Sequence, residues 1–62
     1  MTDYFYHTAM GKAVLHIEGK PLKYLGKFKT EAIAKQKCDA HFAAACKAAD
    51  NFGRARPRAY FM

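Results

Sequence analysis

The side chains able to support catalysis or metal binding are few and dispersed in this sequence. Cys38 and His41 form a ligand-like pair, but structural zinc needs four ligands in tight pairs, and no second pair stands at a suitable spacing. The chain has no serine, and its cysteines lie in an alanine-rich stretch without an evident base. The five carboxylates are scattered, and no glycine-rich phosphate loop occurs. We therefore expect no enzyme activity, no catalytic residue, no metal and no cofactor.

Positive charge is the more informative property. Eleven lysines and arginines stand against five carboxylates, which gives a formal net charge of +6 on 62 residues. Such a field favours polyanions, although it also serves solubility or an acidic protein partner. The cations concentrate near the middle of the chain and in its tail. The candidates for phosphate contacts are Lys23, Lys27, Lys29, Arg54, Arg56 and Arg58.

Three short segments have the composition of β-strands. Residues 4–8, 13–17 and 22–28 are rich in aromatic and β-branched side chains, and Gly11 and Gly19 stand in the two turns between them. Two successive hairpins form an antiparallel meander. On the second strand, Ala13, Leu15 and Ile17 share the face that we expect to point to the core.

A helix is predicted after the third strand, from Thr30 to Asn51. Thr30 is a good N-cap, and the apolar spacing that follows has a period of 3.6 residues. Phe42 and Phe52 are expected to be the main large side chains that this helix packs on the sheet. The expected sheet-facing stripe is Ala34, Cys38, His41, Phe42, Ala45, Ala49 and Phe52.

The predicted fold class is α+β, a three-stranded antiparallel sheet packed against one C-terminal helix in the order β-β-β-α. Residues 1–53 would form this single domain, and residues 54–62 a basic C-terminal arm or an extended segment pinned by Tyr60 and Phe61. The expected least exposed residues are Leu15, Ile17, Phe28, Cys38 and Phe42.

Length and composition also bear on location and ligands. No apolar run approaches the roughly 20 residues of a membrane span, and the first residues lack the regions of a signal peptide. Cys38 and Cys46 would lie about 12 Å apart along the helix, too far for a disulfide. A chain this small has little room for a deep cleft. We expect a cytoplasmic protein with no membrane contact and no small-molecule substrate.

The corner between the third strand and the helix resembles a known family. Gly11-Lys12, the run Tyr24-Leu25-Gly26-x-Phe28-x-Thr30, and Ala34 and Asp39 are similar to the pattern of the Apetala/ethylene-response-factor DNA-binding domain. The three-stranded DNA-binding modules of phage and transposon integrases are similar in outline. The resemblance spans roughly residues 4–49. It implies that the sheet face away from the helix enters the major groove of DNA.

The positions that would meet DNA under this resemblance contain no arginine or lysine. They carry aromatic and apolar side chains instead, and Glu18 among them would repel phosphate. These positions are Tyr6, Thr8, Met10, His16, Glu18, Leu22 and Tyr24.

Two hypotheses on function follow. In the first, the protein is a small basic nucleic-acid-binding module, phage-type, that contacts DNA through lysines of the third strand and the arginine arm. In the second, it is a small phage-type protein that binds and inhibits or redirects a host protein through the aromatic and apolar face of the sheet away from the helix. The alternative is that the C-terminal segment covers this face. The residues expected to contact that host protein are Tyr6, Met10, His16, Leu22 and Tyr24.

Overall fold

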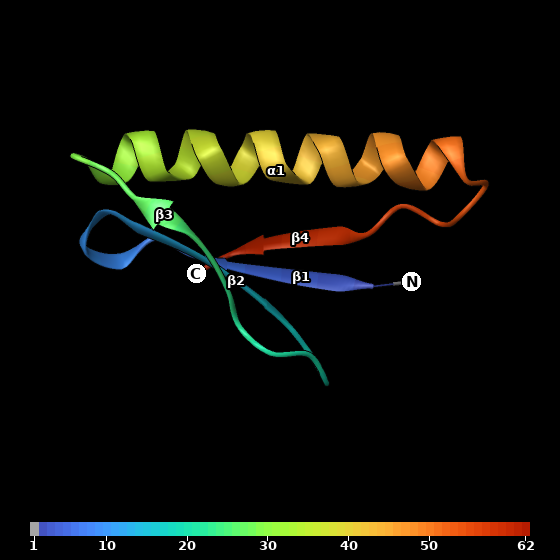
Figure 1. Cartoon of the computed structure of the whole chain (residues 1–62), viewed down its shortest axis with the longest axis horizontal. Helices are drawn as coiled ribbons and strands as arrows, with labels where there is room; N and C mark the ends of the chain where they lie inside the picture. The colour runs from blue at the N-terminus through green and yellow to red at the C-terminus, as the bar shows by residue number, and fades with distance from the viewer. Residues whose placement is uncertain (1) are drawn as a thin grey trace.

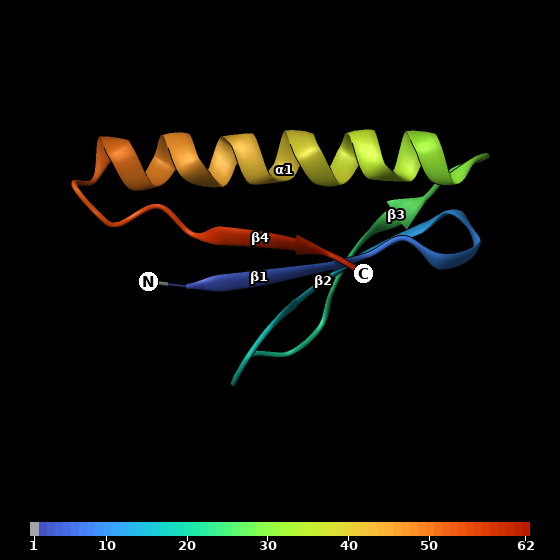
Figure 2. The same cartoon turned by 180° about the vertical axis from the view of Figure 1, so that it is seen from behind.

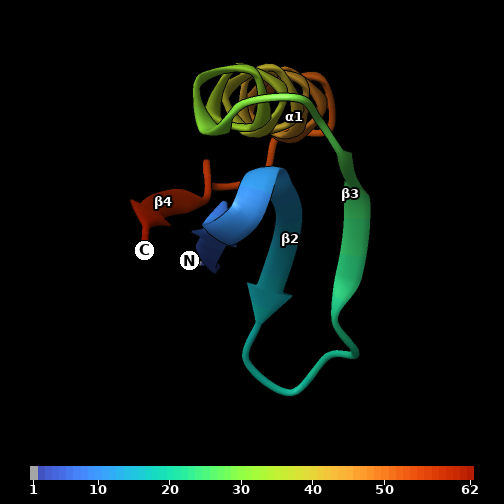
Figure 3. The same cartoon turned by 90° about the vertical axis from the view of Figure 1, so that its left-hand side faces the viewer.

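A computed structural model describes residues 2–62, so residue 1 of the expected domain 1–53 lies outside it. Within residues 2–62, four strands form one sheet in the order β3-β2-β1-β4, and α1 packs on one of its faces (Figure 1, Figure 3). The predicted α+β class is confirmed. The elements in chain order are β1 (Asp3–His7), the 3-10 turn η1 (Ala9–Gly11), β2 (Lys12–Ile17), β3 (Lys23–Lys27), α1 (Glu31–Asn51) and β4 (Arg58–Phe61).

The sheet has mixed pairing. β1, β2 and β3 form the two expected antiparallel hairpins, and β4 then pairs with β1 in parallel (Figure 2). The expectation of only three strands followed by a C-terminal helix is corrected by β4. Aromatic side chains hold β4 in place: Tyr60 stacks on Phe5 with ring centroids 5.2 Å apart, and Phe61 stacks on Tyr6 at 5.3 Å.

Local signals determine where α1 begins and ends. The Thr30 hydroxyl oxygen accepts a hydrogen bond from the Ile33 N–H at 3.2 Å, as an N-cap does. At the other end, Gly53 adopts φ +65, a left-handed conformation in which a helix commonly terminates. The prediction of a helix from Thr30 to Asn51 is confirmed, with Thr30 as its cap.

A close backbone approach joins the turn before β2 to the corner before α1. The Phe28 N–H donates to the Gly11 carbonyl oxygen at 2.8 Å. A Cβ added to Gly11 would lie only 2.5 Å from the Phe28 carbonyl oxygen, and Gly11 also has φ +73. Only glycine satisfies both conditions. This contact fixes where the chain turns from the sheet into α1.

The core is a thin layer between α1 and the sheet. Leu15 and Cys38 are buried as predicted, whereas Ile17, Phe28 and Phe42 are half-buried around them. Phe52 does not pack on the sheet as expected and is 74% exposed, because it is the C-cap residue, where the chain leaves the helix. The buried cluster consists of Tyr6, Ala13, Leu15, Ala34 and Cys38.

Candidate functional site

The strand register assigns each side chain to one of two faces. Tyr6 lies opposite the buried Leu15, so both point toward α1, and side chains at alternate positions point the other way. We call the second surface the open face, because no helix or strand of residues 2–62 covers it (Figure 3). The open face carries Phe5, His7, Lys12, Val14, His16, Tyr24, Lys27, Tyr60 and Met62.

An aromatic row crosses three neighbouring strands of the open face. The Phe5 ring lies 6.0 Å from His16 on β2, and it stacks on Tyr60 of β4 at an interplanar angle of 18°. Beside this row is a shallow hollow of about 350 Å³, lined by Phe5, His7, His16, Glu18 and Met62. The row and the hollow offer apolar and aromatic contact rather than an enclosed ligand pocket.

Large apolar side chains are exposed around the aromatic row. Tyr24, which lies opposite Val14 on the open face, is 59% exposed, and Met62 is 69% exposed. Leu22 stands one residue before β3 and is 68% exposed. Met10, in the turn η1, is 81% exposed and has φ +57, which is unfavourable for a residue with a side chain. These four exposed side chains thus project apolar surface into solvent.

Tyr6 is not part of the open face, contrary to the prediction. Its side chain is fully buried on the helix side, and its hydroxyl lies 2.8 Å from Nδ1 of His41. Burial, and then the nearby Lys23 ammonium, lower the pKa of His41. Burial is also the main cause that raises the pKa of Tyr6. Tyr6 and His41 therefore form a neutral hydrogen-bonded pair inside the core.

The arginines of the predicted basic arm have local partners. Arg56 binds Asp50 through two nitrogens, Nε to Oδ1 at 2.9 Å and the terminal nitrogen to Oδ2 at 2.6 Å. Arg58 binds Asp3 through Nε at 2.9 Å. The Arg54 guanidinium lies 5.5 Å from the centre of the Phe52 ring. These contacts reduce the charge that Arg56 and Arg58 can offer to phosphates.

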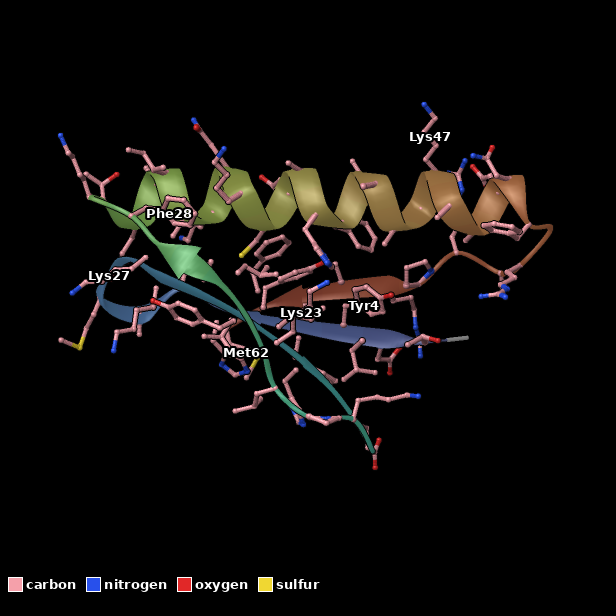
Figure 4. The ribbon with its side chains drawn as sticks, viewed as in Figure 1. Tyr4, Lys23, Lys27, Phe28, Lys47 and Met62 are labelled. Carbon is pink, nitrogen blue, oxygen red and sulfur yellow. The ribbon has the colours of Figure 1, made fainter. Side chains whose placement is uncertain are left out.

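The predicted lysines do not share one surface. Lys23 lies opposite Leu15 on the helix side, while Lys27 is on the open face and Lys29 is exposed at the corner before α1. Figure 4 shows Lys23 and Lys27 in separate places and Lys47 directed away from the sheet. The six expected phosphate-binding residues are therefore dispersed rather than gathered into one site.

One pair of lysines does stand together. Lys12 and Lys27 are cross-strand partners on the open face, directly opposite each other. Like charges in this position repel and weaken a sheet. The pair adds positive charge to the open face at the end near η1.

The residues able to bind metals are not gathered among residues 2–62, where no group of three or more His, Cys, Asp or Glu side chains is placed to hold an ion. Both cysteines are free thiols, and burial raises the pKa of Cys38. No helix in this described range has the length and hydropathy needed to span a bilayer.

The sequence-based list of contact residues missed Phe5, Tyr60 and Met62. Simple alternation along Tyr4-Phe5-Tyr6 could have indicated that Phe5 faces away from both tyrosines. Tyr60 and Met62 reach the open face only through the parallel pairing of β4 with β1, for which no local signal exists.

Comparison with protein-family models, with curated proteins and with solved structures found no match. The resemblance to the Apetala/ethylene-response-factor domain therefore stays a prediction.

Proposed function

We propose that the protein binds another protein through the open face of its sheet. The observation that supports this most is the exposure of Tyr24, Tyr60 and Met62 on the open face, where these side chains are between 42% and 69% exposed. Contiguous exposed apolar surface on a small domain usually marks an interaction site, and Tyr and Met are enriched in such sites. The C-terminal segment extends this surface, because β4 adds Tyr60 to it.

The distribution of charge favours a protein over nucleic acid as the ligand. Arg56 and Arg58 are paired with carboxylates, and Lys23 lies on the other side of the sheet. A phosphate-binding surface normally presents its cations along one face. The phage-type origin, the host protein as target and the cytoplasmic location are parts of the same proposal.

A capture experiment with two single substitutions tests the proposal. The immobilised protein is exposed to host lysate with and without nuclease treatment, and the captured protein is then titrated in purified form. Tyr24→Ala removes an exposed aromatic side chain from the open face, and we expect it to weaken binding by about thirtyfold, since a central aromatic anchor is worth about 2 kcal/mol. Lys29→Ala, the matched control at an exposed site off the face, should bind nearly as the wild type does.

Folding must be checked in both variants by circular dichroism and thermal melting. Binding that is lost with nuclease, or that Lys29→Ala impairs more than Tyr24→Ala, would contradict the proposal and favour nucleic acid.

Single-stranded nucleic acid is a second candidate ligand, supported by two features of the open face. The row of His16, Phe5 and Tyr60 has aromatic rings on which bases could stack, and Lys12 and Lys27 stand close beside each other on the same face. Fluorescence anisotropy with a labelled oligonucleotide tests this candidate. Binding should weaken with salt at a log–log slope of about 0.7 per phosphate contact, and Phe5→Leu should weaken it further. A flat response to salt would exclude it.

A further inference from the structure

The two edges of the sheet differ in how they are protected from pairing with another strand. The β3 edge carries Lys23 and Lys27. It also has a bulge at Leu25, which has no partner on β2 because the consecutive residues Ala13 and Val14 pair with its two neighbours. Lysines and bulges are the devices that prevent edge-to-edge association. The β4 edge has neither between Ala59 and Phe61, and Figure 3 shows no segment of residues 2–62 beyond it.

The backbone of β4 leaves hydrogen-bonding groups free in a regular pattern. The Arg58 N–H donates to the Thr2 carbonyl oxygen and the Met62 N–H to the Tyr6 carbonyl oxygen, both at 2.8 Å. In a parallel ladder, every second residue bonds to the same neighbour, and the residues between them point outward. Ala59 and Phe61 therefore direct their N–H and C=O groups away from the sheet.

We propose that two copies of the chain associate through their β4 edges, antiparallel and related by a two-fold axis at Tyr60. In this register, Ala59 of each copy lies opposite Phe61 of the other. The two pairs exchange four backbone hydrogen bonds, which use all the outward groups of Ala59 and Phe61. The two Tyr60 residues face each other as a non-hydrogen-bonded pair, in which Cα atoms approach to about 4.5 Å.

The side chains are complementary in this arrangement. On the helix side, the Phe61 ring, 46% exposed in the single chain, lies beside the small Ala59 of the second copy, and this pairing occurs twice by symmetry. On the open face, the two Tyr60 rings meet at the axis. Aromatic pairs directly across an antiparallel ladder are favourable. The association thus covers apolar surface that the single chain exposes.

The association is closed rather than open-ended. A two-fold contact uses the β4 edge of both copies, and the two edges that remain are β3 edges, which lysines and a bulge protect. The product is an eight-stranded sheet with the open faces of both copies on the same side. Because the contact is one short strand per copy, we expect a weak dimer, with a dissociation constant of about 10 to 500 μM.

Sedimentation velocity of the purified chain, over about a hundredfold range of concentration around that dissociation constant, measures the association. Tyr60→Lys places two like charges opposite each other at the axis, and we expect it to raise the dissociation constant at least about tenfold. Tyr24→Lys is the matched control, because it makes the same substitution on the same face at the other edge strand. It should leave the dimer unchanged.

Amide hydrogen exchange provides a second measurement that does not depend on any variant. The Ala59 and Phe61 amides should exchange fast in dilute solution and slow down as concentration rises, whereas the Arg58 amide, already bonded to Thr2, should change little. A mixture of labelled and unlabelled chains should show an intermolecular NOE between Phe61 and Ala59.

A chain that stays monomeric up to about 1 mM would overturn the proposal. So would a dimer that Tyr24→Lys dissociates and Tyr60→Lys does not, or one that grows into larger assemblies. These measurements contain no other protein, so they are independent of the proposed binding function.

Discussion

The Tyr6 hydroxyl on β1 lies 2.8 Å from Nδ1 of His41 on α1, and this hydrogen bond joins the sheet to the helix inside the core. Burial raises the pKa of Tyr6 and lowers that of His41, so both groups are neutral at pH 7. Which of the two groups donates the hydrogen bond depends on the tautomer of the neutral His41 ring. The pair satisfies two polar groups in the layer between α1 and the sheet.

Tyr6→Phe should lower the free energy of unfolding by about 1 to 3 kcal/mol, because it leaves Nδ1 of His41 without a partner in the core. Tyr4→Phe is the matched control, since the half-buried Tyr4 ring packs on Phe42 from the same strand and face. Urea unfolding of both variants measures the difference. Equal losses in the two variants would show that the hydrogen bond contributes no stability of its own.

Stability should decrease as the pH falls below 6.5, the ordinary pKa of histidine, because the pKa of His41 is lowered in the folded protein. Below pH 6.5, His41 binds a proton in the unfolded chain but not in the folded chain. The loss of stability therefore develops between pH 6.5 and the lower pKa of His41 in the folded protein, and it levels off below that pKa. Urea midpoints between about pH 8 and pH 5 follow this loss. In His41→Gln that part of the pH dependence should vanish, and a slope that persists unchanged would assign it to other groups.

Gly11→Ala should destabilise the fold by about 3 kcal/mol or more, because the new Cβ would lie 2.5 Å from the Phe28 carbonyl oxygen in addition to the left-handed backbone. Gly19→Ala isolates the backbone part, since Gly19 has φ +77 and a Cβ there meets nothing within 4 Å. It should cost only about 1 kcal/mol. Thermal melts of the two variants that shift equally would refute the close contact.

Met10→Asn should raise the free energy of unfolding by about 0.5 to 1 kcal/mol. Met10 adopts φ +57, and asparagine tolerates this region better than methionine. The lost side chain is 81% exposed, so its removal costs little burial. Leu22→Asn is the control, since Leu22 is also exposed but has no such backbone conformation. If both variants change stability alike, strain at Met10 is not the cause.

Asp50→Asn and Asp3→Asn should each increase affinity for single-stranded DNA more than Asp39→Asn does. All three raise the net charge by one, but the first two also release Arg56 and Arg58. The released arginines can then offer their full charge to phosphates, whereas equal gains in all three variants would show that the pairing withholds no charge. Anisotropy titrations at one fixed salt concentration distinguish these outcomes.

The local elements of this fold were predictable, because their signals lie within a few residues of each other. Thr30 caps α1, and the alternation of Ala13 and Leu15 identifies the buried face of β2. β4 was not predictable in the same way. Its pairing of Tyr60 with Phe5 joins distant parts of the chain, and periodicity within a short window carries no information on such contacts.

The open face was predicted only in part, because local alternation determines some of its side chains and long-range strand pairing determines the others. His16 and Tyr24 follow from alternation along β2 and β3, and both were correctly placed on the face away from the helix. Tyr6 was misplaced because its side depends on the register with Leu15. Charge was also misleading, since a count of arginines does not reveal that Asp50 and Asp3 lie within reach of two of them.

The parallel pairing of β4 with β1 determines the order in which the sheet can form. The β2–β3 hairpin closes across residues 18–22, whereas β4 must reach β1 across residues 8–57. The longer closure costs about 2 kcal/mol more in chain entropy, so the meander should form before β4 attaches. Until then β1 is an unprotected edge strand with Tyr4, Phe5 and Tyr6 along it. The interval before β4 docks is therefore the stage of folding at which this chain is most prone to aggregate.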